Sequence, residues 1–293
     1  MKNTFKHWLE QRYTPQTVKT YLFAVETYRN TPKSFDIEHA DYPQIFSYLR
    51  AMRDKDWTAN YIQTCLMAIK AYYKFLVHTG HRPDNPARDI LLNDTKKAKN
   101  RKVDFHDLFS PQELELLLDY PSRYTLMIAR NKLIISLYIY QGLTTGELVR
   151  LTPENIDFDE ETVFVKASTT HNSRILELKE NQLDYAYRYV NWDRERLLKS
   201  HHPQLFISKL GTGDKGKNMH YLISAQRSLF PDRTLNPMTI RQSVIVNWFK
   251  HEHLPVKEVQ TRAGHKWPMT TEQYKPTDIS GLKDAMSKYH PMG

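Results

Sequence analysis

Apolar residues recur every three or four positions through about the first hundred residues, which is the spacing of one buried helix face. Thr14-Pro15 is a typical helix start, with a hydroxyl at the N-cap and proline at the first helical position. We predict further helices over 42–53 and from Thr58 to a stop at Gly80. With their short connections, these segments predict a compact four-helix bundle of about 90 residues.

Composition narrows the class of protein further. Glycine and proline number 9 + 15 = 24 of 293 residues, which favours long regular elements over a loop-rich sandwich, and a hydrophobic share of 40% is enough to build cores. The single cysteine, Cys65, excludes a disulfide framework and a cysteine-based zinc cluster, and its helical spacing predicts a buried thiol. The sequence contains no signal-peptide core and no apolar run long enough to span a bilayer, so we expect a cytoplasmic protein.

Positive charge is concentrated in one short segment. The formal net charge is 42 − 33 = +9, and five of the seven residues from 96 to 102 are cationic: Lys96, Lys97, Lys99, Arg101 and Lys102. One interpretation is a solvated linker, and the other is a basic strap that lies across a polyanion. Both place a domain boundary here, so we predict a helical domain over 1–92, a basic linker over 93–104 and a second domain over 105–293.

The hydrophobic period changes inside this second domain. Helices are expected over 112–119 and 126–140, but 155–166 alternates around an acidic turn and 174–178 alternates again. Helical spacing returns over 182–199, 239–253 and 256–263. A glycine-rich segment, 211–217, lacks the Gly-Lys-Ser/Thr ending and the flanking strand and helix of a nucleotide-binding loop. We therefore expect a mainly α protein whose C-terminal α+β domain contains an antiparallel sheet of two or three strands.

Three residues near the C-terminus are candidates for chemistry. Arg241 falls in the first turn of a predicted helix, where a guanidinium can hold two phosphate oxygens. His265 follows the helix stop at Gly264, and Tyr274 comes nine residues after it. Taken singly, each has an ordinary explanation, namely an exposed arginine, a hydrogen-bonded structural histidine and one of 18 tyrosines.

Together these residues resemble the tyrosine recombinase (phage integrase, Xer-like) family. The segment 262–274, Arg-Ala-Gly-His-Lys-Trp-Pro-Met-Thr-Thr-Glu-Gln-Tyr, is similar to the family's Gly-His box and tyrosine segment. Arg241, 24 residues before His265, matches the arginine of the His-x-x-Arg box. Residues 141–148 resemble the Gly-Leu-Arg-x-x-Glu-Leu segment, and Asn85-Pro86-Ala87 resembles the end of the SAM-like core-binding domain. The resemblance covers nearly the whole chain.

The resemblance implies a chemistry without a cofactor. In the family, a tyrosine hydroxyl attacks a DNA phosphodiester and forms a 3′-phosphotyrosine, arginines hold the non-bridging oxygens, and a hairpin lysine protonates the leaving oxygen. It implies that Tyr274 is the nucleophile, Arg241 a phosphate clamp and His265 a phosphate contact. It also implies double-stranded DNA as partner and a DNA-dependent homo-oligomer formed through the tail 279–293. The alternative for this amphipathic tail is a helix that packs on its own domain.

Three of the family's six catalytic positions are altered. Thr144 stands where the first arginine belongs, Met238 stands in place of the first histidine, and Ser168 or Thr169 occupies the hairpin-lysine position. Losing one charge-stabilising donor typically costs about 10²–10³ in rate. Possible replacements are Lys166, His171, Arg174 and Arg150, although Arg150 is expected to point away from Thr144 along a helix.

Three functions remain open from the sequence. The first is site-specific recombination or integration of a mobile element with a modified active site, which the joint presence of Arg241, His265 and Tyr274 favours. The second is an inactive, architectural or regulatory DNA-binding relative, which the three altered positions favour. A protein-interaction module that has lost DNA binding is the third, and the basic charge argues against it.

Overall fold

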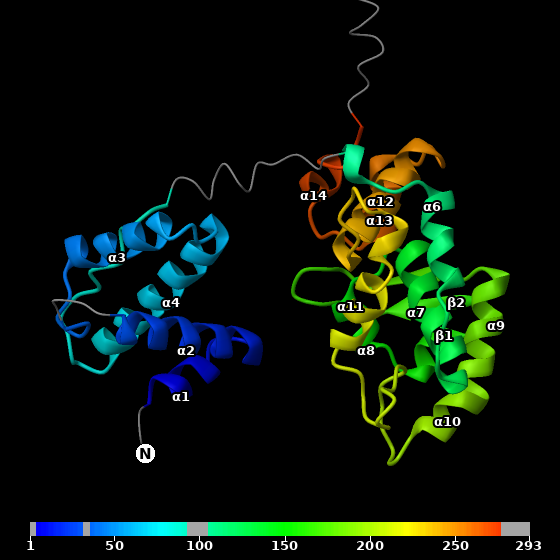
Figure 1. The fold of residues 1–293 in the computed structure, drawn as a ribbon, viewed down its shortest axis with the longest axis horizontal. Coiled ribbons are helices and arrows are strands. Elements are labelled where there is room, and N and C mark those ends of the chain that lie inside the picture. The colour runs from blue at the N-terminus through cyan, green and yellow to red at the C-terminus, as the bar shows by residue number, and fades with distance from the viewer. Residues whose placement is uncertain (1–3, 32–35, 93–104, 277–293) are drawn as a thin grey trace, which may run out of the picture. The chain divides into compact units, whose positions relative to one another are not determined.

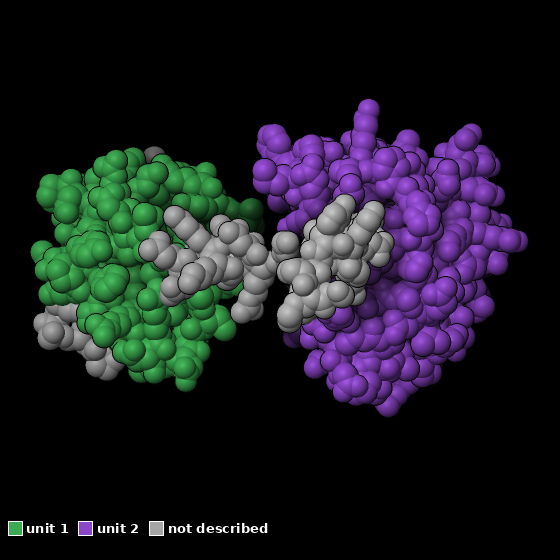
Figure 2. Space-filling view, turned by 90° about the horizontal axis from the view of Figure 1, so that it is seen from above, with its two compact units in different colours: residues 1–101 green, residues 102–293 purple. Residues whose placement is uncertain are grey.

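The computed structural model of the chain describes residues 4–31, 36–92 and 105–276. It forms two compact units, residues 1–101 and 102–293, which are coloured separately in Figure 2. Both units are mainly helical, and the second contains one small sheet, which confirms the predicted fold class. The cationic run Lys96, Lys97, Lys99, Arg101 and Lys102 and the expected linker lie outside the described residues, so the limits of that linker stay a prediction.

Among its described residues, unit 1 forms the predicted bundle of four helices: α1 Phe5–Glu10, α2 Pro15–Asn30, α3 Tyr42–Asp54 and α4 Ala59–His78. Each begins at a residue whose side-chain oxygen accepts a backbone N–H of the first turn, namely Thr4, Thr14, Asp41 and Thr58. Their apolar faces meet in a core that includes Leu9, Tyr28, Ile45 and Leu66. Cys65 is buried on α4, as its spacing predicts.

Unit 2 contains nine α-helices among its described residues: α6 Pro111–Glu115, α7 Ile128–Ile139, α8 Thr145–Arg150, α9 Glu180–Arg188, α10 Arg194–Leu197, α11 Lys217–Ser224, α12 Pro237–Lys250, α13 Val256–Ala263 and α14 Pro268–Glu272. The segment predicted as one helix over 182–199 is α9, a π-helical turn over Tyr189–Asp193 and α10. Helix α11 begins at Lys217, the last residue of the glycine-rich segment 211–217, so the expectation that no helix flanks this segment is wrong. Gly216 allows this start because it adopts the left-handed φ of 83°.

The sheet is antiparallel with strand order β1-β2-β3, formed by β1 Ile156–Asp157, β2 Thr162–Val165 and β3 Arg174–Glu177. Val163 pairs with Leu176 and Val165 with Arg174. Side chains alternate between faces, so Val163, Val165 and Leu176 are buried, and Arg174 lies on the same buried face. A cation therefore points inward at the end of the sheet that carries the β2–β3 turn.

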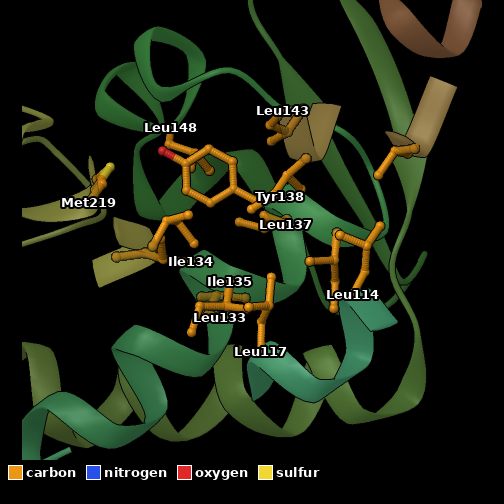
Figure 3. Packing of buried hydrophobic residues seen from close by; sticks show 14 of the residues in the cluster. Leu114, Leu117, Leu133, Ile134, Ile135, Leu137, Tyr138, Leu143, Leu148 and Met219 are labelled. Carbon is orange, nitrogen blue, oxygen red and sulfur yellow. The ribbon is translucent and has the colours of Figure 1, made fainter. Parts of the chain in front are cut away.

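Helix α7 organises the core of unit 2, because it is buried on nearly all sides and packs against α6, α9, α11 and α12 (Figure 1). Tyr138 of α7 lies among Leu143, Leu148 and Met219 in Figure 3. After α7 the chain turns at Gly142, which has a φ of 59°, and enters α8. No described helix is both long and apolar enough to cross a membrane.

Candidate active site

Arg241 lies on the first turns of α12, whose N-cap is Asn236 and whose first residue is Pro237. Only 4% of its surface is exposed. Its Nη1 donates to the carbonyl oxygen of Gly142 at 2.5 Å, and its Nη2 donates to that of Ala263 at 2.6 Å. Burial lowers the pKa of Arg241 to about 10, so the guanidinium stays protonated at neutral pH. Arg241 thus holds a fixed positive charge between the α7–α8 turn and the end of α13.

His265 is positioned by the glycine that ends α13. Gly264 adopts a φ of 70°, and the imidazole that follows is 5% exposed, with Nδ1 2.9 Å from the Thr271 hydroxyl. His265 and His171 pair as an antiparallel bridge, which ties the β2–β3 turn to the same place. Burial, together with the charges of nearby arginines, lowers the pKa of His265 to about 3. The imidazole is therefore neutral at physiological pH.

Tyr274 follows α14, and its backbone N–H donates to the carbonyl of Thr271. Its ring stacks on that of His265 with centroids 5.9 Å apart and is 9% exposed. The Tyr274 hydroxyl makes no hydrogen bond within the described part of the chain. The structure thus brings the three residues that the sequence singled out, Arg241, His265 and Tyr274, into one site.

The three altered positions have other tasks in this structure. Thr144 caps α8, where its hydroxyl donates to Glu147 at 2.9 Å and accepts from the Glu147 N–H. Met238 is 58% exposed on α12. The Ser168 hydroxyl accepts N–H groups of Thr170 and His171 inside the β2–β3 turn. None of these side chains brings a positive charge or an imidazole to the site.

The four possible replacements lie in different surroundings. Lys166 is exposed just after β2, where its charge acts on Glu154. Arg150 is exposed at the end of α8. The half-buried ring of His171 lies 6.2 Å from that of His265, and burial lowers its pKa. Arg174 alone of these four is buried, with 5% of its surface exposed.

Arg174 and Glu147 form an ion pair that sequence reasoning did not assign. Arg174 Nη1 donates to Glu147 Oε1 at 2.7 Å, and both side chains are almost fully buried. Burial alone would raise the pKa of Glu147, but the hydrogen bond and charge of Arg174 outweigh it and lower this pKa to about 2. The signal available in the sequence was the alternation of 174–178, which puts Arg174 on the same face as Leu176.

The charges of this site are unequal. Arg241 and Arg174 are buried cations, and Arg150 adds a third positive charge that acts on His171. Glu147 supplies a negative charge that acts on both histidines. No cluster of three or more histidine, cysteine or acidic side chains suited to a metal occurs among the described residues. The arrangement is suited to binding an anion beside a tyrosine hydroxyl.

Comparison with known proteins agrees with this geometry. The family model described as "Phage integrase family" matches residues 107–279, and the model of the N-terminal SAM-like domain of phage integrases matches residues 5–80. The chain belongs to the phage integrase family. It is 21% identical to a tyrosine recombinase XerC from Lacticaseibacillus casei, over 97% of this chain and 95% of the relative.

Solved tyrosine recombinases share the fold of this family member. The XerH site-specific recombinase bound to difH substrate has a TM-score of 0.68 at 16% identity, covering 94% of this chain and 80% of that chain. A lambda integrase dimer bound to a COC′ core site has a TM-score of 0.64 at 14% identity, covering 93% of both chains. The match to the family model confirms the resemblance seen in the sequence, and these structures confirm the fold.

Proposed function

We propose that this protein carries out site-specific DNA recombination or integration of a mobile element through a 3′-phosphotyrosine intermediate. The observation that carries the proposal is the convergence of Arg241, His265 and Tyr274 from α12, the α13 stop and the segment after α14 in one electropositive site. The XerC and XerH relatives, which are recombinases by name, support the same reaction class.

In this reaction the Tyr274 oxygen bonds to the scissile phosphorus, and the bond to the 5′-oxygen breaks. The phenol proton leaves Tyr274, and the departing strand end takes up a proton to become a 5′-hydroxyl. Arg241 stabilises charge on the non-bridging oxygens, while its two carbonyl contacts hold the guanidinium in place. Neutral His265 can donate one N–H hydrogen bond to a phosphate oxygen, since its other ring nitrogen faces the Thr271 hydroxyl. The reverse attack by another 5′-hydroxyl rejoins the strands without an external energy source.

We infer that double-stranded DNA is the partner and that both units bind it, with the run Lys96–Lys102 contacting phosphates. A DNA-dependent homo-oligomer through the tail, which includes Leu282 and Met286, belongs to the same proposal. Both the run and the tail lie outside the described residues. The lambda integrase structure, a dimer bound to its core site, supports this assembly. The location that goes with this function is the cytoplasm.

A second candidate function is an inactive relative that binds DNA as an architectural or regulatory protein. It is favoured by the surroundings of the three altered residues, none of which brings a charge to the site: Thr144 caps a helix, Ser168 closes a turn and Met238 faces solvent. This candidate predicts specific DNA binding without strand cleavage.

Covalent trapping separates the two functions. A binding selection from random duplexes supplies the cognate site, and nicked suicide duplexes of that site are incubated with the native protein and with Tyr274→Phe. The proposal expects a protein–DNA adduct on a denaturing gel with the native chain and none with the variant, at equal DNA affinity. Tight binding without an adduct would refute strand cleavage and favour the architectural function.

A further inference from the structure

Arg174 has more hydrogen-bond donors than the protein satisfies. Its Nη1 is bonded to Glu147, but Nε and Nη2 are buried and have no partner. Among the described residues, no other side chain leaves more than one buried polar atom unpaired. An unmade hydrogen bond on a buried charged group is costly, so two on one guanidinium call for a physical explanation.

Arg174 is also held firmly in place. Its position on the buried face of β3 is set by the pairing with Val165, and the Glu147 carboxylate is fixed in turn by the N–H and hydroxyl of Thr144. On another side, the guanidinium lies so close to the Gly264 backbone that a Cβ there would overlap it. A side chain restrained in this way presents its two free donors in a fixed direction.

The charges around Arg174 indicate the class of ligand. Arg174 and Arg241 are two buried cations that share one buried carboxylate, Glu147, which leaves an excess of one positive charge. His265 beside them is neutral and does not change this balance. One phosphodiester carries one negative charge and two non-bridging oxygens, so it would satisfy both the charge and the free donors.

We propose that Arg174 binds the scissile DNA phosphate together with Arg241 and supplies, from β3, the second guanidinium that Thr144 cannot. This inference rests on the proposed function for the identity of the DNA phosphate. Because Nε and Nη2 are closed off in the DNA-free chain, DNA binding has to move the atoms that cover them. Glu147 then acts as a positioning residue that leaves those two nitrogens, and not Nη1, for the phosphate.

The test is a set of DNA-binding measurements with single neutral phosphates. The selected duplex carries one methylphosphonate, placed in turn at each position of the site, and is bound by the native chain and by Arg174→Lys. Lysine keeps the charge opposite Glu147 but removes the fork. We expect the native chain to lose about tenfold or more in affinity at one phosphate, and Arg174→Lys to lose clearly less there, because only the Arg241 contact is left for the neutral phosphate to remove.

The matched control is Arg130→Lys. Arg130 is another buried arginine of unit 2 that is paired with a buried carboxylate, that of Asp214, and it leaves its Nε unpartnered. It should keep the native sensitivity pattern, and circular dichroism melting should show that all three proteins are folded. If Arg174→Lys stays as sensitive as the native chain at every phosphate, Arg174 does not bind the phosphate and the inference is overturned.

Measuring adduct formation distinguishes a failure of this inference from a failure of the proposed function. With an active native chain, we expect Arg174→Lys to slow trapping by about 10²–10³ and Arg130→Lys to change it only a few-fold. The native chain could form no adduct and still lose affinity at one methylphosphonate in a way that depends on Arg174. That result would refute strand cleavage and support the anion site. Arg174→Lys and the methylphosphonate can each slow trapping, and the two effects together show whether they act at the same contact. Effects that add fully would point to a structural role for Arg174 and overturn the inference.

Discussion

Replacing Glu147 with glutamine tests how strongly the buried ion pair stabilises unit 2. Glutamine has nearly the same shape and is accepted at the third position of a capping box, so the cap formed with Thr144 should survive. What the change removes is the negative charge opposite Arg174, in a place where both side chains are almost fully buried. The two buried guanidiniums of Arg174 and Arg241 would then lose the carboxylate whose charge offsets theirs.

The magnitude follows from the carboxylate's pKa. It falls from an ordinary 4.5 to about 2 in the folded chain, and a difference of about 2.5 units corresponds to about 3 kcal/mol of stability. Because the folded pKa is the lower one, this stability is complete above about pH 4.5 and is lost as the pH falls towards 2. Removing one partner from a buried pair generally costs about 3–5 kcal/mol, so we expect Glu147→Gln to lower the free energy of unfolding by about 3 kcal/mol at pH 7.

Native-state hydrogen exchange of α7 and α12 measures this free energy within unit 2. The matched control is Glu113→Gln, because Glu113 also has a pKa of about 2 and pairs with Arg233, but about a third of its side chain is exposed. Solvent screening should reduce its effect to about 0–1 kcal/mol. Equal destabilisation by the two substitutions would refute the argument that burial gives the Glu147 pair its strength.

The remaining predictions concern the other polar groups of the site. The pKa of His265 in the folded chain lies below its usual 6.5, so the unfolded chain binds the extra proton, and the free energy of unfolding should decline as the pH drops from about 6.5 towards 3. Urea denaturation over a pH series measures this decline, and His265→Asn should flatten it. An unchanged slope in the variant would contradict the prediction. Gly264→Ala should destabilise unit 2 by about 1–2 kcal/mol, because residue 264 has a left-handed φ. It should also slow adduct trapping, because the new Cβ overlaps the Arg174 guanidinium. A variant with native melting and native trapping would show that the contact is unimportant.

The elements of this fold are largely readable in the sequence because their signals are local. A capping threonine and apolar spacing of three and four predict α2 and α4 within a few residues, and α2 also has a proline in its first turn. The helix predicted over 256–263 matches α13. The segment over 182–199 was harder, because nothing in its spacing marks the π-helical turn that divides it. α11 was missed where a left-handed glycine starts a helix without a side-chain cap.

By itself, the sequence determined the helical character of both units, the small sheet and the set Arg241, His265 and Tyr274, because periodicity and short motifs are properties of neighbouring residues. Only the tertiary structure decided which side chains meet Glu147, since strand pairing brings Arg174 to a helix 27 residues earlier in the chain. Burial, which depends on every neighbour at once, then made Arg174, one of the four possible replacements in the sequence, a buried cation with free donors. Spacing along the chain cannot report such a contact, because the charge balance of a site is a property of the packed fold.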